Sequence, residues 1–154
     1  MLKAKTDFSK TKKNIIFFGI LNCIVYIILF MAFKWLDLLH FSGLRMLNYV
    51  TFFILSLYQI RRWTKQAGGY IPSFQAFTAI FFTGALSFML LAGFIFAYSL
   101  YDHYITELYF NTYGKLSSIS SALIFFEGLA GSLIVALVAM MYSDRYKDGE
   151  ASIS

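Results

Sequence analysis

Glu127 is the residue of this sequence best suited to carry chemistry, because it is an ionisable side chain within a long apolar run. It is the only charged residue between Lys115 and Asp144, and it lies near the middle of that run. An ionisable group at the centre of a bilayer costs roughly 2.5–3.5 kcal/mol on insertion scales and marks a functional site by default. The chemistry open to it is binding a proton or a cation, or bonding with polar groups of neighbouring helices.

Four further polar residues are candidates to share a layer with Glu127. At the helical rise of about 1.5 Å per residue, Glu127 lies about 4 Å and Asn48 about 6 Å from the centre of its own apolar run, toward the same leaflet. Tyr26 falls at a similar level, and Asn22 lies slightly to the other side. Arg45 precedes Asn48 by about one turn, so it either snorkels outward or bends toward the carboxylate with Asn48 as the bridge. The sequence thus predicts an intramembrane polar cluster.

Three interpretations of this cluster stay open. In the first, the carboxyl group is neutral or paired and helps to specify the fold through hydrogen bonds. In the second, it binds a proton or a cation during transport or signalling. In the third, it is an interaction site for another membrane protein. A coupling role requires a wetted carboxyl group, whereas a structural role predicts a dry and permanently bonded one.

Four apolar runs are long enough to hold these residues in a membrane. A hydrocarbon core of about 30 Å needs roughly 20 apolar residues in a helix, and backbone groups in lipid must be bonded internally. We therefore expect transmembrane helices over residues 14–33, 44–60, 76–101 and 117–142. The 154 residues form one all-α integral membrane domain, an antiparallel four-transmembrane-helix bundle, with a basic tail over 1–13 and a polar tail over 143–154.

Each predicted helix carries one stripe of small or polar residues at helical spacing, such as Gly19, Asn22, Tyr26 and Phe30 in the first helix and Ala76, Ala79, Thr83 and Ser87 in the third. Small residues allow helix backbones to approach closely, and hydroxyl or amide groups bond across helices. Four such stripes predict helices that face a common centre, with the Phe-, Ile- and Leu-rich faces toward lipid. The small residues expected at helix contacts are Gly19, Ser87, Gly128, Gly131 and Ser132.

Composition and charge support a membrane location. The chain is 59% apolar and 14% charged, whereas a soluble domain is about a quarter charged. Placing both termini in the cytoplasm puts most lysines and arginines on that side, as the positive-inside rule requires. Trp35 and Trp63 fall near the ends of the first two runs, where they are expected to anchor the helices at the membrane interface.

Other classes of site find little support. One cysteine, Cys23, and two histidines do not form a metal-ligand set. The basic tail adjoins an apolar run and suits lipid headgroups better than nucleic acid. No cofactor fingerprint or nucleophile–base arrangement occurs, so we expect no enzyme and no cofactor. A lipid-modifying enzyme at the outer surface would need His103, Asp102 and His40 to cluster.

Residues 60–77, IRRWTKQAGGYIPSFQAF, resemble a bacterial membrane family catalogued as domain-of-unknown-function family 4199, which occurs mainly in Bacteroidetes. In that family a basic segment precedes a glycine pair, and a Ser-Phe and Ala-Phe pattern opens the third helix. The resemblance implies a four-helix protein of the bacterial inner membrane. The family brings no known activity and no known site residues.

Together these observations predict a small polytopic inner-membrane protein of unknown molecular function, a non-enzymatic component of a membrane protein assembly. Its expected partners are the lipid bilayer and other membrane proteins or copies of itself, with no nucleic acid. The alternative is a small transporter, or a proton- or cation-coupled membrane subunit, that works through Glu127.

Overall fold

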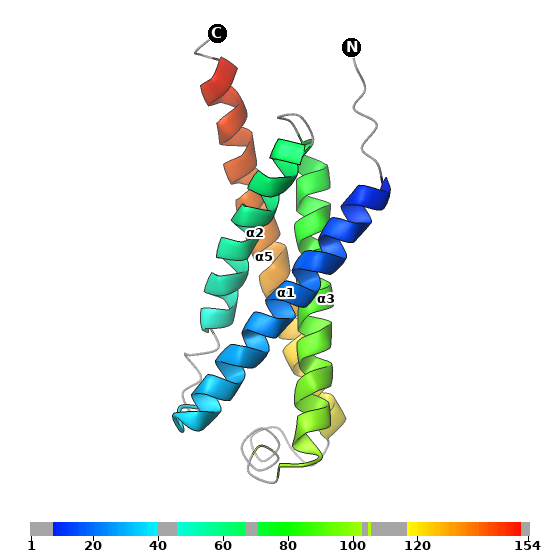
Figure 1. Cartoon of the computed structure of the whole chain (residues 1–154), viewed down its shortest axis with the longest axis vertical. Helices are drawn as coiled ribbons and strands as arrows, with labels where there is room; N and C mark the ends of the chain where they lie inside the picture. The colour runs from blue at the N-terminus through cyan, green and yellow to red at the C-terminus, as the bar shows by residue number, and fades with distance from the viewer. Residues whose placement is uncertain (1–7, 40–45, 67–70, 103–104, 106–116, 152–154) are drawn as a thin grey trace.

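The computed structural model describes residues 8–39, 46–66, 71–102, 105 and 117–151. This part of the chain contains four long helices and no strand, so the all-α prediction is confirmed. The helices in chain order are α1 (Phe8–Trp35), α2 (Met46–Gln66), α3 (Ser73–Ser99) and α5 (Ser117–Ala151) (Figure 1).

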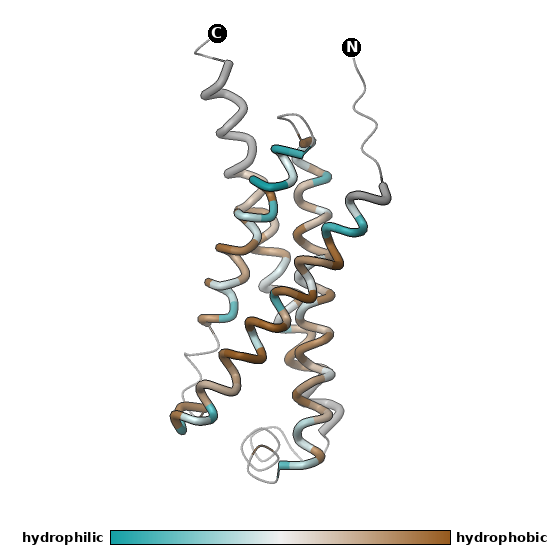
Figure 2. The backbone as a smooth tube through the Cα atoms, in the orientation of Figure 1, coloured by the Kyte–Doolittle hydropathy of each residue, from teal (hydrophilic) through white to brown (hydrophobic). Residues whose placement is uncertain are grey.

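Three of the four helices are long and apolar enough to cross a membrane. The qualifying stretches are Thr11–Trp35, Ser73–Ser99 and Ala122–Met141. In α2 the apolar stretch gives way to a hydrophilic end that carries Arg61, Arg62 and Lys65 (Figure 2). These three helices could span a membrane, which is consistent with a multi-pass membrane protein, whereas a fourth crossing by α2 stays a prediction.

Most helix ends differ from the predicted spans; α1, for example, begins at Phe8 rather than at residue 14. Helix α2 continues to Gln66 and α5 to Ala151, because lysine, arginine and glutamate extend a helix readily once it has left the apolar region. Helix α3 ends earlier, at Ser99, where the amides of Leu100 and Tyr101 bond to carbonyls three residues back. At its other end Pro72 precedes the first helical residue, and its carbonyl accepts bonds from the amides of Gln75 and Ala76.

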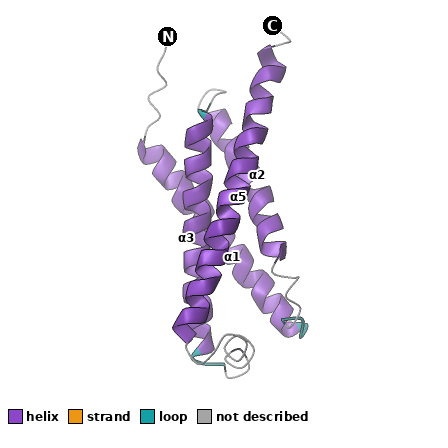
Figure 3. Ribbon diagram, turned by 180° about the vertical axis from the view of Figure 1, so that it is seen from behind, coloured by secondary structure: helices purple, strands orange, loops and turns teal. Residues whose placement is uncertain are grey.

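Helix α3 is the centre of the arrangement. It packs along α5 and is crossed obliquely by α1, and α2 contacts both α1 and α5 (Figures 1 and 3). Helices α1 and α5 make no backbone contact with each other in the described part of the chain. The start of α1, the end of α2, the start of α3 and the end of α5 lie at one end of the molecule (Figure 1).

The predicted small and polar stripes of α1 and α3 face inward. Residues 19, 22, 26 and 30 of α1, and residues 76, 79, 83 and 87 of α3, are all buried. Gly84 shows how closely α3 and α5 approach, because a Cβ atom at this position would lie 2.1 Å from the Ser132 hydroxyl oxygen. Large apolar side chains such as Ile28, Ile54 and Phe82 are exposed and provide the lipid-facing surface.

Two hydrogen bonds join the helices through polar side chains at one level. The Gln59 amide nitrogen of α2 donates to the Thr83 hydroxyl of α3 at 3.0 Å. The Ser87 hydroxyl of α3 donates to the Gly19 carbonyl of α1 at 3.1 Å. We call Gln59, Thr83 and Ser87 the bonded layer.

Candidate functional site

A pocket lies between the four helices. It holds about 50 Å³ of space for water-sized molecules and is partly open to the outside. All four helices contribute to its lining, which consists of Tyr26, Phe30, Asn48, Tyr49, Phe88, Leu91, Ile95, Ile124 and Glu127. We call this space the Glu127 pocket. It brings together Glu127, Asn48 and Tyr26, three of the five residues of the predicted polar cluster.

Helical periodicity explains how each element supplies its part of the lining. Tyr26 and Phe30 are one turn apart on α1, and Ile124 and Glu127 are three residues apart on α5. Such pairs share one face of a helix. Asn48 and its neighbour Tyr49 come from the first turn of α2. Helices α1 and α5 therefore both line the pocket although their backbones do not touch.

Aromatic rings form one wall of the pocket. The Phe88 ring stacks on Tyr26 with 5.2 Å between centroids, and it lies 5.6 Å from the ring of Tyr49. Two glycines of α5 make room for these rings. A Cβ atom would lie 2.2 Å from Phe88 Cγ if placed on Gly128, and 2.2 Å from Tyr49 Cε1 if placed on Gly131. The predicted packing glycines thus hold the aromatic wall against α5.

Three oxygen-bearing side chains in the pocket lack a bonding partner within the described residues. The Tyr26 hydroxyl and the Asn48 carbonyl oxygen are buried and have no hydrogen-bond partner among these residues. The Glu127 carboxylate forms no hydrogen bond or ion pair there either. A buried polar group without a partner costs about 1–3 kcal/mol, so these atoms form a site that gains from an occupant.

Glu127 lies where the pocket opens. It is the one exposed residue of the lining, whereas Tyr26 is 1% exposed and Phe88 is 3% exposed. On the same exposed side of α5 lie the apolar residues Leu123 and Phe126. The carboxylate therefore faces both the pocket and the outside of the chain.

The other members of the predicted cluster do not line the pocket. Asn22 is fully buried, but its amide nitrogen donates to the carbonyl of Phe18 in its own helix at 2.9 Å. Arg45 lies outside the described residues, so its pairing with Glu127 stays a prediction. Ser87 belongs to the bonded layer, and the Ser132 hydroxyl donates to the Gly128 carbonyl of its own helix at 2.7 Å.

The two tryptophans differ in their surroundings. Trp35 is 89% exposed at the last residue of α1, as an interface anchor would be. Trp63 is 5% exposed and packs with Ile71, Ala76 and Ala79 in a small cluster between α2 and α3. Its indole therefore stabilises a helix contact, and its role as an interface anchor stays a prediction.

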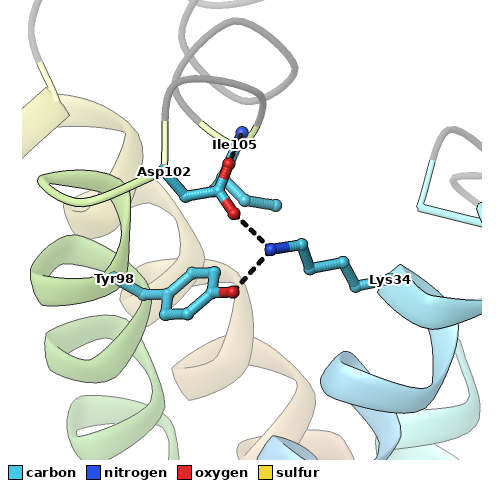
Figure 4. A network of polar contacts seen from close by, with 4 residues as sticks. All are labelled: Lys34, Tyr98, Asp102 and Ile105. Atoms are coloured by element: carbon cyan, nitrogen blue, oxygen red, sulfur yellow. Dashed lines mark hydrogen bonds and ion pairs between the residues drawn. The ribbon is translucent and has the colours of Figure 1, made fainter.

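A second polar site joins the end of α1 to the turn after α3, and sequence reasoning missed it. The Lys34 ammonium donates to the Tyr98 hydroxyl at 2.5 Å and to the Asp102 carboxylate (Figure 4). It also lies 4.7 Å from the centroid of the Tyr98 ring. We call this set the Lys34 clamp. The sequence did contain a signal for it. Lys34 and Asp102 carry opposite charges, and each directly follows an apolar run that is predicted to end on the same side of the membrane.

The remaining candidates for chemistry give no site. His40 and His103 lie outside the described residues, and Asp102 is engaged by Lys34. Within the ranges that the structure describes, no three or more His, Cys, Asp or Glu residues are grouped to hold a metal ion.

Compared with protein-family models, with curated proteins and with solved structures, the chain matches none of them. The resemblance to family 4199 stays a prediction that rests on residues 60–77.

Proposed function

We propose that this chain is a small multi-pass protein of the bacterial inner membrane that binds a proton or a small cation at Glu127. Binding would be coupled to transport or to the state of a membrane complex. One observation carries the proposal: the Glu127 carboxylate has no bonding partner in the described residues and lines a pocket to which all four helices contribute.

The state of the carboxylate favours coupling over a purely structural role. A structural carboxyl group would be bonded to other side chains, but Glu127 is unbonded within the described residues. An occupant that bonds to Tyr26, Asn48 and Glu127 would connect α1, α2 and α5. Such an occupant would favour the arrangement of the three helices that brings these groups together.

The composition of α2 is compatible with a fourth crossing in an antiparallel bundle. Its polar residues Ser56 and Gln59 are buried, and Asn48 lines the pocket, so they do not face lipid. Such a helix needs less hydropathy than one exposed on all sides. The excess of basic residues in the tails and near the end of α2 supports cytoplasmic termini. Membership of family 4199 would imply a location in the bacterial inner membrane.

A second candidate function, a non-enzymatic component of a membrane protein assembly, is favoured by the exposed side of α5. Glu127 lies there beside Leu123 and Phe126. A helix of another membrane protein, or of a second copy, that covered this side would both exclude lipid and bond the carboxylate.

The experiment that tests the proposal is infrared difference spectroscopy of the carboxyl stretch in bilayers. We expect a carboxyl band that changes when the pH or the cation concentration is changed and that is absent in Glu127→Gln. The matched control is Asp37→Asn, which removes an exposed carboxyl group outside the pocket. A Glu127 band that stays in one state under both changes would contradict coupling and favour the assembly role.

A further inference from the structure

We infer that the Glu127 pocket takes a small ammonium-type cation, of the size of ammonium or methylammonium, in preference to a metal ion. The inference rests on the proposed function and names the class of cation that the site recognises. Three features of the pocket carry it: its unpartnered oxygens, its aromatic wall and its volume.

The unpartnered oxygens match the N–H groups of an ammonium ion. Carboxylate and amide carbonyl oxygens accept hydrogen bonds, and a tyrosine hydroxyl can accept as well as donate. Glu127, Asn48 and Tyr26 present these groups from α5, α2 and α1. A primary ammonium group has three N–H donors, so it can satisfy one acceptor from each of three helices, and its bond to the carboxylate is charge-assisted.

The aromatic wall suits a cation that carries its charge on a nitrogen and its hydrogens. Tyr26, Tyr49 and Phe88 line the pocket, and the Phe88 ring contacts the rings of both tyrosines. The negative faces of aromatic rings attract ammonium groups, most strongly where water is excluded. Phe88 is 3% exposed and Tyr26 is 1% exposed, so this wall is shielded from solvent.

The ligand set does not suit a divalent metal ion. Calcium takes six to eight oxygen ligands, and magnesium requires an octahedral set at about 2.0–2.1 Å. The pocket offers three unpartnered oxygen-bearing side chains, while Leu91, Ile95 and Ile124 complete an apolar lining. A metal ion would have to bring most of its hydration shell into that lining.

The volume limits the size of the cation. The pocket has about 50 Å³ for water-sized molecules, and a cavity measured in this way holds one water in about 10–15 Å³. A few heavy atoms therefore fit, which is enough for ammonium or methylammonium. Tetramethylammonium is larger and has no N–H donor, so it serves as a cation of the same charge that cannot bond to the pocket oxygens.

The test is a calorimetric titration of the protein in lipid nanodiscs with methylammonium chloride. Sodium, potassium and tetramethylammonium chlorides are titrated separately at the same pH and ionic strength. We expect methylammonium to bind at least about tenfold more tightly than sodium or potassium, a difference that corresponds to one charge-assisted hydrogen bond. We expect no binding of tetramethylammonium.

Variants locate the binding in the pocket. Tyr26→Phe removes one oxygen and keeps the ring, and it is expected to weaken methylammonium binding by about three- to tenfold. Tyr58→Phe makes the same change on the exposed side of α2 and is expected to leave the affinity unchanged. Glu127→Gln removes the charge and is expected to abolish measurable binding.

The outcomes separate the inference from the proposed function. Equal affinity for methylammonium and potassium, lost in Glu127→Gln, would overturn the inference and keep the proposed function. A carboxyl band that responds to pH without binding any of the four cations would identify a proton as the occupant and would also overturn the inference. No cation binding and no pH response would overturn both.

Discussion

The bonded layer and the Glu127 pocket are two polar regions of the same chain, and they differ in whether their side chains bond between helices. In the bonded layer, Gln59, Thr83 and Ser87 make hydrogen bonds that connect α1, α2 and α3. In the pocket, Tyr26 and Asn48 have buried oxygens without a partner in the described residues. Single unpartnered atoms also occur elsewhere, at Gln59 Oε1, Asn22 Oδ1 and Ser56 Oγ, so the pocket is set apart by the several unpartnered groups that line one space.

Side-chain length and position in the helix explain the difference. Short hydroxyls bond to the carbonyl four residues back, as Thr83 does to Ala79 at 2.7 Å and Ser87 does to Thr83 at 2.6 Å. A tyrosine hydroxyl lies too far from its own backbone for such a bond.

The two asparagines show the effect of position. Asn22 lies inside α1 and bonds to the Phe18 carbonyl one turn back. Asn48 lies in the first turn of α2, so the helix offers its amide nitrogen no carbonyl four positions earlier. The side-chain carbonyl oxygens of both asparagines have no partner in the described residues, and only Asn48 lines the pocket.

The largest expected effect on stability comes from adding one methyl group at Gly84, near the bonded layer, or at Gly131, behind the aromatic wall of the pocket. We expect Gly84→Ala to lower the free energy of unfolding by about 2 kcal/mol, because its Cβ would meet the Ser132 side chain and the Phe52 ring. Gly131→Ala should cost about 1 kcal/mol, because the Tyr49 ring that it meets can swing into the pocket. Unfolding in mixed micelles monitored by circular dichroism measures both.

Gly93→Ala is the matched control, since a Cβ there has nothing within 4 Å. It reports the gain in helix propensity alone, about 0.5–1 kcal/mol in favour of alanine. Equal losses at Gly84 and Gly131 would show that the pocket wall is packed as rigidly as the contact between α3 and α5, and the comparison between the two regions would fail.

A smaller effect is expected from double-mutant cycles on one pair in each region. Gln59→Leu combined with Thr83→Val should give a coupling free energy of about 0.6 kcal/mol, the average for hydrogen bonds between membrane helices. Tyr26→Phe combined with Asn48→Leu should give a coupling near zero, because neither side chain is hydrogen-bonded. The same unfolding measurement applies to each of the six variants.

The cycles contain their own control, because each single variant reports the loss of burial and packing apart from the pairwise term. A clear coupling between positions 26 and 48 would mean that these side chains bond to each other in the membrane. The pocket would then be a second bonded layer with no vacancy for a cation.

Part of the fold was predictable because small and polar residues recur at the helical period, so spacing and polarity indicate the same buried face of a helix. The stripe of Gly19, Asn22, Tyr26 and Phe30 was read from spacing alone, and the structure buries all four residues. The presence of Glu127, Asn48 and Tyr26 around one space also followed from counting residues at a fixed rise per residue.

The aromatic wall was not predictable, because the chain has 18 phenylalanines and 11 tyrosines and most positions of that kind face lipid or other rings. What selects Phe88 and Tyr49 is the position of Gly128 and Gly131 on a helix that is distant in sequence. The bonded or unbonded state of each polar atom also depends on distances of a few tenths of an ångström, which spacing does not supply.

The smallest expected effect concerns the Lys34 clamp, whose carboxylate has a partner that the pocket carboxylate lacks. The side chains of Lys34 and Asp102 are 28% and 22% exposed, so water and salt screen their attraction. We expect Lys34→Gln with Asp102→Asn to show a weak coupling that falls as salt rises from about 0.05 to 0.5 M. Lys65→Gln, an exposed lysine at the end of α2, should show no coupling to Asp102→Asn. A coupling that salt does not change would place the clamp out of water. Its ion pair would then be a bonded counterpart of the unpaired Glu127 carboxylate away from water, and the contrast between a paired and an unpaired carboxylate would no longer follow from solvent access.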